Sequence, residues 1–274
     1  MRLIGAELLK IRTTSTWWAF TLIMLPLWAL AVLYNWGTAN ITSGIDDADV
    51  PDDQAELVRV AGAAVNVATT MYTSGQFLGV LLVMLLGAII VTNEFFHLTA
   101  TTTFLVTPHR ERVVLAKLAA AVLAGLLFWL ITTVLNLIVV PFILDSLDIA
   151  AQLGEPAIWR AIGLNALAFV LWAIVGVGAG VLIRSQLGAT LTLSIAYVIG
   201  TFGGSLVFFL LSEYVADWFS KLQVLVPTTA SQLMISGTEL PGNPPRWVGA
   251  AVLIGYAVVT GVLGTAIMKR RDVS

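Results

Sequence analysis

Apolar residues fill six long stretches of the chain in which Asp, Glu, Lys and Arg do not occur. Each stretch is at least 22 residues long, and none alternates between apolar and polar positions as a barrel strand does. A helix needs about 20 apolar residues to cross the hydrocarbon core of a bilayer. The pattern therefore predicts six transmembrane helices, with cores at 17–34, 76–92, 118–144, 161–183, 187–211 and 247–268.

The basic residues are divided unevenly between the two sides of the membrane that these helices define. Of the 14 Lys and Arg residues, ten lie on the side of the N-terminus and four on the opposite side. Because cytoplasmic loops carry the excess of Lys and Arg, we expect both termini to be cytoplasmic. A cleaved signal peptide at 1–31 is disfavoured, because the apolar run from Trp17 to Tyr34 is long for such a segment.

Residues 1–16 precede the first predicted span and have the pattern of an amphipathic helix. The apolar residues of one helical face are Ile4, Leu8 and Ile11. Glu7 and Lys10 lie apart from that face and form an i,i+3 pair. We expect a short helix in the inner interface of the membrane. The alternative is a frayed cytosolic tail.

The predicted outer loop at 35–70 is strongly acidic. Its carboxylates are Asp46, Asp47, Asp49, Asp52, Asp53 and Glu56. Clustered carboxylates suit a calcium ion, but the glycine and glutamate that frame an EF-hand loop are missing. We therefore expect a solvated acidic loop and no metal site.

Two connectors are apolar although they lie outside the predicted spans. The cytosolic connector at 93–117 contains Phe95, Phe96, Leu98, Phe104, Leu105 and Val106. Such surface is costly to expose unless it lies on the bilayer or docks on another protein, and the residues alone leave both options open. The outer connector at 212–246 is divided by Pro227 and predicts one or two short re-entrant or outer-leaflet helices.

Composition excludes several classes of function. Hydrophobic residues make up 58% of the 274 residues, charged residues only 11%, and the net charge is −2, which excludes a basic nucleic-acid binder and a disordered chain. The chain has no cysteine and hence no disulfide, zinc ribbon or thiol nucleophile. Gly-Lys, which a phosphate-binding loop requires, does not occur, so any ATP hydrolysis belongs to another chain.

Ionisable residues are also missing from the six predicted cores, and both histidines, His97 and His109, lie in the cytosolic connector. Proton-coupled transport and intramembrane catalysis need such groups near the midplane. We therefore do not expect an enzyme or a proton exchanger. The remaining candidates to line a path are the polar residues of the third and fifth spans: Thr132, Thr133, Asn136, Thr190, Thr192 and Ser194.

Glycines recur at four-residue spacing in the fourth and fifth predicted spans. The pairs are Gly176 with Gly180 and Gly200 with Gly204. This spacing lets helices approach closely. Packing within one chain is the favoured interpretation, with a subunit contact or passage of substrate as the alternatives.

The chain as a whole resembles the membrane subunit of ABC-2 type transporters, in particular the bacterial exporter permeases. The features that carry the resemblance are the start at 6–14, the six spans with both ends inside, the sequence 226–230 before the last span, and a run that contains Glu94, Thr99 to Thr103, Pro108, Arg110 and Lys117. The chain has Leu98-Thr99 where many members have Gly-Thr. The resemblance implies a single transmembrane domain at 1–274.

In that family the connector between the second and third spans is a coupling helix that docks on a cytosolic ATPase. The candidate contacts that the resemblance implies are Glu94, Phe95, Phe96, His97, Leu98, Phe104, Leu105 and Arg110. It also implies two copies of the ATPase, which would hold ATP and magnesium, and a second copy of this permease or a homologous one. The expected location is the bacterial inner membrane, surrounded by lipid, and no nucleic acid is expected as a partner.

The function expected from these features is export of a hydrophobic or amphipathic substrate, such as a drug, peptide or lipid, including multidrug efflux. Two other readings stay open. One is a membrane sensor or assembly component that transports nothing. The other is a channel lined by the polar residues of the third and fifth spans.

Overall fold

The computed structural model describes residues 2–43, 58–97, 110–239 and 243–270, and every regular element in this part of the chain is helical. Within these residues, six helical segments are long and apolar enough to cross a membrane, as predicted, so the chain is a multi-pass membrane protein. The elements are α1 (Arg2–Thr13), α2 (Thr16–Ser43), α4 (Ala64–Tyr72), α5 (Gln76–Phe96), α7 (Arg110–Asp145), α8 (Pro156–Ile183), α9 (Gln186–Tyr214), the 3-10 helix η2 (Asp217–Leu225), α10 (Pro227–Ile235) and α11 (Arg246–Arg270).

The helices extend beyond the predicted apolar cores. Helix α7 begins at Arg110 rather than at 118, and α2 continues to Ser43 rather than ending at 34. Hydropathy marks only the part of a helix that lies in hydrocarbon, whereas backbone hydrogen bonding continues through polar and charged residues at the membrane surface. Helix α8 begins at Pro156, because proline at the first helical position loses no hydrogen bond there.

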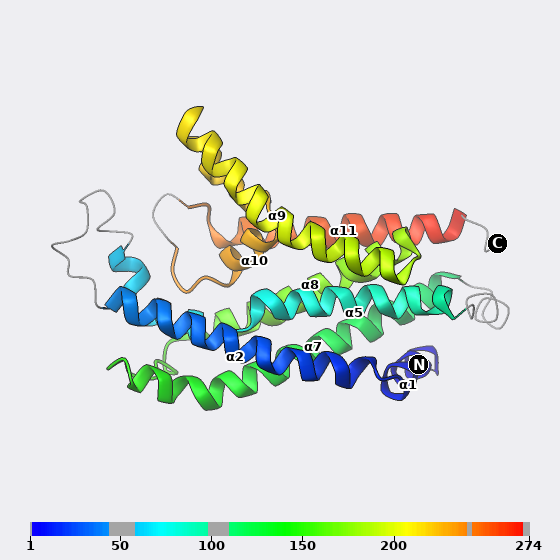
Figure 1. The fold of residues 1–274 in the computed structure, drawn as a ribbon, viewed down its shortest axis with the longest axis horizontal. Coiled ribbons are helices and arrows are strands. Elements are labelled where there is room, and N and C mark those ends of the chain that lie inside the picture. The colour runs from blue at the N-terminus through cyan, green and yellow to red at the C-terminus, as the bar shows by residue number, and fades with distance from the viewer. Residues whose placement is uncertain (1, 44–57, 98–109, 240–242, 271–274) are drawn as a thin grey trace.

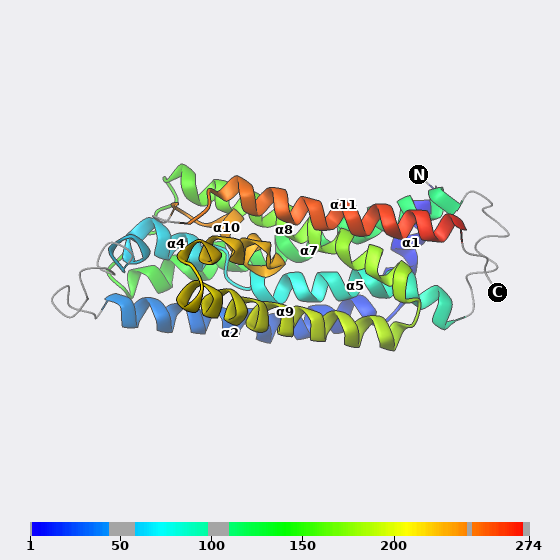
Figure 2. The ribbon, with the colours of Figure 1, turned by 90° about the horizontal axis from the view of Figure 1, so that it is seen from above.

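Helices α5 and α8 form the centre of the bundle. In the span formed by α4 and α5, 72% of an apolar stretch of 18 residues is buried inside the protein. In α9 only 6% of such a stretch is buried. Figure 2 shows α5 and α8 between α11 on one side and α2 with α9 on the other. Figure 1 shows that α9 diverges from the bundle toward its C-terminal end, and that α1 and the end of α11 lie at the same end of the molecule.

Glycine allows the central helices to pack closely. A Cβ atom on Gly176 would lie 2.0 Å from the backbone oxygen of Met84, and one on Gly180 would lie 2.7 Å from that of Ala88. The Gly176/Gly180 pair therefore packs α8 against α5 within the chain, as the spacing predicts. Of the second pair, Gly200 has open space where a Cβ would stand, whereas a Cβ on Gly204 would lie 2.9 Å from Val226 Cγ2.

The second span is interrupted, which the sequence pattern did not predict. Helix α4 ends at Tyr72 and α5 begins at Gln76, so α4 occupies part of the segment expected to be an acidic loop. Gly75 adopts a left-handed conformation (φ 86°), and a Cβ there would lie 3.0 Å from Trp28 Cδ1. A buried break of this kind leaves backbone groups that another part of the protein must satisfy.

Asn136 of α7 satisfies the break. Its Nδ2 donates hydrogen bonds of 3.0 Å to the backbone oxygens of both Tyr72 and Ser74, and its Oδ1 accepts one of 2.7 Å from Trp28 Nε1. A single buried amide thus joins α7, the break and α2. These three bonds hold the break in the second span against α7 and α2.

Candidate functional site

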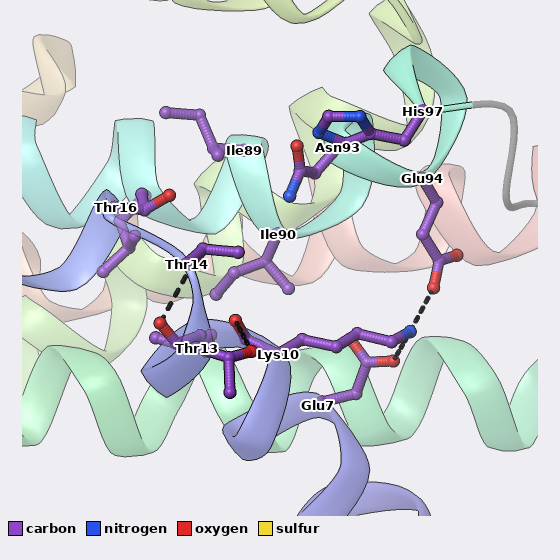
Figure 3. A pocket seen from close by; sticks show the side chains of 12 residues that line it. Glu7, Lys10, Thr13, Thr14, Thr16, Ile89, Ile90, Asn93, Glu94 and His97 are labelled. Carbon is purple, nitrogen blue, oxygen red and sulfur yellow. Dashed lines mark hydrogen bonds and ion pairs between the residues drawn. The ribbon is translucent and has the colours of Figure 1, made fainter.

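Four charged side chains from three helices meet at the end of the bundle where α1 lies. Glu7 and Lys10 come from α1, Glu94 from the last turns of α5, and Lys117 from α7. Figure 3 shows Lys10 reaching between the carboxylates of Glu7 and Glu94. We call these four residues the charge cluster.

Short ion pairs join the four residues of the charge cluster. Lys117 Nζ lies 2.9 Å from Glu7 Oε2 and 3.0 Å from Glu94 Oε1. Lys10 Nζ lies 2.9 Å from Glu7 Oε1 and 2.7 Å from Glu94 Oε1. Each ammonium group therefore contacts both carboxylates.

Three of the four side chains of the charge cluster are buried, so their charges must be paired within the protein. The side chain of Lys117 is 1% exposed and those of Glu7 and Glu94 are each 7% exposed, whereas Lys10 is half exposed. Lys117 Nζ also donates to the backbone oxygen of Ile90 at 3.2 Å. Buried charges are tolerated when their hydrogen bonds are satisfied in this way, and removing one partner is strongly destabilising.

The cluster also changes the protonation of Lys10, which lies outside the membrane-spanning segments. Partial burial disfavours the charged ammonium, but hydrogen bonds to Glu7 and Glu94 and the charges of these two residues outweigh burial. Together they raise the pKa of Lys10 above its ordinary value of 10.5. Lys10 therefore stays charged throughout the physiological range of pH.

A cavity of about 330 Å³ lies beside the cluster, between α1, the start of α2 and α5. Thr16, Asn93 and His97 line it together with residues of the cluster (Figure 3). Thr13 and Thr14 also line it, but their hydroxyls donate to backbone oxygens of α1. No group of three or more acidic or histidine residues that could hold a metal ion occurs within the described ranges.

The predicted coupling residues are separated by the structure into different environments. Phe95 packs against the core and lies under Arg184, whose Cζ is 5.5 Å from the ring centroid. Phe96 is 68% exposed and contacts His97 edge to face, with ring centroids 5.0 Å apart. Glu94 belongs to the charge cluster. Leu98, Phe104 and Leu105 lie outside the described residues, and so does the side chain of Arg110.

The predicted path residues lie on two helices, α7 and α9. Thr132, Thr133 and Asn136 are buried on α7. Thr132 donates to backbone oxygens of its own helix, and Asn136 holds the break in the second span. On α9, Thr192 is exposed, Ser194 is half-buried, and Thr190 donates to the backbone oxygens of Gln186 and Leu187.

A larger cavity of about 980 Å³ lies toward the other end of the bundle. It is bounded by α2, by α4 and the first residues of α5, by α9 and by α10. We call it the polar cavity, because serine, threonine, asparagine and glutamine provide most of its polar lining. None of these residues was among the site residues predicted from the sequence. The signal was the run Thr69-Thr70-Met71-Tyr72-Thr73-Ser74-Gly75-Gln76, an unusually polar interruption of an apolar stretch.

Helix α5 connects the two features. Gln76 at its first turn lines the polar cavity, and Glu94 near its last turn belongs to the charge cluster. At about 1.5 Å of rise per residue these positions are about 27 Å apart along the axis. The helix between them contains no proline, so it is suited to transmit displacement along its length.

Comparison with known proteins does not assign the chain to a family: no protein-family model matches it, and no curated protein matches it.

Proposed function

We propose that this chain is the permease subunit of an ATP-driven exporter, and that a separate cytosolic ATPase moves it through the segment between α5 and α7. The sequence resemblance to ABC-2 type permeases is the starting point. In this proposal both termini are cytoplasmic, α1 lies in the inner membrane interface, and η2 and α10 lie toward the outer leaflet. A second permease copy completes the translocation path.

The observation that carries the proposal is the charge cluster at the two ends of the connecting segment 98–109. The ion pair between Glu94 and Lys117 joins the end of α5 to the start of α7, and Glu7 with Lys10 adds α1 to the same unit. A force applied to the connecting segment would therefore displace three helices together. A connecting segment that only lay on the membrane surface and bound no partner would need no such buried ion pairs.

Exposed side chains next to the cluster suit a docking contact. Phe96 and His97 are both exposed at the end of α5, directly before the connecting segment. Large exposed apolar groups mark interaction sites when they are surrounded by polar residues. A partner that contacts Phe96 and His97 would push on α5, and α5 would carry the movement to the polar cavity.

The first test asks what accompanies the protein when it is purified from its native membrane after mild crosslinking. We expect a soluble subunit with a phosphate-binding loop in stoichiometric amount. Reconstitution of the pair in vesicles is expected to stimulate ATP hydrolysis. A chain that carries no such subunit, or a subunit whose ATPase activity does not respond to the permease, contradicts the proposal.

A second test uses Phe96→Asp. Because Phe96 is exposed, the variant is expected to fold normally. The ATPase activity that the permease stimulates is expected to fall at least tenfold. Tyr214→Asp is the matched control, since Tyr214 is 80% exposed at the end of α9. Equal activity of the two variants would remove Phe96 from the contact. Phe95→Asp is unsuitable, because Phe95 packs against the core.

A further inference from the structure

We infer that the polar cavity binds an uncharged amphipathic molecule whose polar part carries hydroxyl or amide groups. Its volume of about 980 Å³ is at the upper end of the range for pockets that hold small-molecule ligands. The inference rests on the proposed function only in taking this ligand to be the cargo. Binding itself requires neither ATP nor a partner.

The lining of the cavity defines the chemical class. Its polar part consists of eight serine or threonine residues and four asparagine or glutamine residues, and the described lining contains no Asp, Glu, Lys, Arg or His. Apolar and aromatic side chains, including Leu30, Phe77 and Phe202, supply the rest. Such a lining can pair with neutral donors and acceptors and cover an acyl or aromatic part. It offers no counter-ion to a charged group, whose burial would be costly.

Some of these polar groups already have protein partners and others do not. Asn35 Nδ2 donates to Ser74 Oγ at 2.8 Å, and Gln76 Nε2 donates to Ser231 Oγ at 3.2 Å. In contrast, the side chains of Thr70, Ser205 and Gln232 make no hydrogen bond to any described residue. These three come from α4, α9 and α10, so they are available to a ligand from three sides of one cavity.

The break in the second span places backbone at the same site. Ser74 and Gly75 of the break line the cavity. Irregular backbone at membrane depth occurs where protein covers it or where it lines a wet cavity, and broken helices in transporters form binding sites. Here Asn136 supports the break from the side of α7. Its bonds hold the break in place from outside the cavity lining, to which Asn136 does not belong.

The absence of cysteine from the sequence allows a direct test. The full chain carrying Ser205→Cys is reconstituted in nanodiscs and labelled with N-ethylmaleimide. Decanoyl-N-methylglucamide, an uncharged amphiphile with an amide and hydroxyl groups, is added below its micelle concentration. We expect it to slow labelling at least tenfold. Decyltrimethylammonium, a cationic amphiphile of similar chain length, is expected to change the rate less than twofold.

Two variants control the experiment. Val198→Cys lies on the same helix but does not line the cavity, so neither amphiphile is expected to alter its labelling selectively. Adding Gln232→Leu to Ser205→Cys removes an unpaired amide at similar volume. It should raise the concentration needed for protection by at least fivefold.

Three results would overturn the inference: a thiol at position 205 that the reagent cannot reach, equal protection by both amphiphiles, or unchanged protection with Gln232→Leu. Because the assay contains no ATP and no ATPase, such a failure leaves the proposed function standing. Conversely, loss of the proposed function through the purification test leaves a positive binding result intact.

Discussion

Lys117 of α7 is almost completely buried, and its ammonium lies 3.0 Å from the carboxylate of Glu94 on α5. The two residues belong to helices that run in succession along the chain and are joined by the segment 98–109. Their ion pair holds the ends of that segment together independently of what the segment itself contacts. This ion pair is the basis of the proposed coupling, and its contribution to stability can be measured.

Replacing Lys117 with Met is expected to reduce the free energy of unfolding by about 3–5 kcal/mol, because it removes a buried ammonium that contacts the carboxylates of both Glu7 and Glu94. Chemical or thermal unfolding in nanodiscs measures this change. Adding Glu7→Gln removes one of the two carboxylates that lose this ammonium and should recover more than half of the loss. Glu239→Gln, at a half-exposed pair with Arg246, serves as control and should cost less than about 1 kcal/mol. A double variant no more stable than Lys117→Met would contradict the account.

Asn136→Leu is expected to be strongly destabilising, since it leaves Trp28 Nε1 and the backbone oxygens of Tyr72 and Ser74 without their partner. A buried polar group that loses its partner costs about 1–3 kcal/mol. Asn165→Leu is the matched control on α8. Asn165 is buried, and its Oδ1 has no hydrogen bond to the part of the chain that the structure describes. The control should be neutral or stabilising; similar losses in both variants would show that Asn136 has no special role.

Gly176→Ala should destabilise the bundle, because the added Cβ would lie 2.0 Å from Met84 O and force α8 away from α5. We expect a fall in melting temperature of several degrees. Gly163, in the same helix, has open space at the Cβ position. Gly163→Ala should therefore stabilise the folded protein slightly, because alanine lowers the conformational entropy of the unfolded chain. If both substitutions have the same effect, close approach at Gly176 is not what determines this contact.

The raised pKa of Lys10 predicts a dependence on alkaline pH. A pKa that is higher in the folded state adds stability below the unfolded value of about 10.5, and this stability is lost as pH rises through the folded value. Wild type should therefore be more stable than Lys10→Met at neutral pH, and the difference should shrink above pH 10.5. Unfolding measured across this range provides the test, and a constant difference would exclude ionisation of Lys10 as the cause.

The six spans were predictable because each depends on a local property, a long run without charge. The break at 73–75 was not. Hydropathy averages over the hydroxyl groups of this region, so the run of apolar residues does not show where the helix stops. The polar pattern predicted Asn136 as a path residue; its hydrogen bonds to the break depend on how α7 packs against the second span, which the pattern does not contain.

The charge cluster shows a second limit of prediction from sequence, which concerns contacts between distant residues. Glu7 with Lys10 was recognised as a pair, and Glu94 with Lys117 as part of a family pattern, but nothing local joins the two observations. Glu7 and Lys117 are separated by 110 residues and meet only when α1 packs on α7. Charged side chains near a membrane surface are usually exposed to water. Here tertiary packing converts them into a buried contact.

Helix α9 contributes polar groups to the cavity while burying little of itself against the other helices. We therefore expect a mismatch between its apolar length and the hydrocarbon around it to change its tilt, because little of its apolar surface is buried in the bundle. Lipid acyl chains that are longer or shorter would tilt this wall of the cavity before they disturbed α5 or α8. Membrane composition would thereby act on how wide the cavity opens, without any lipid bound in it.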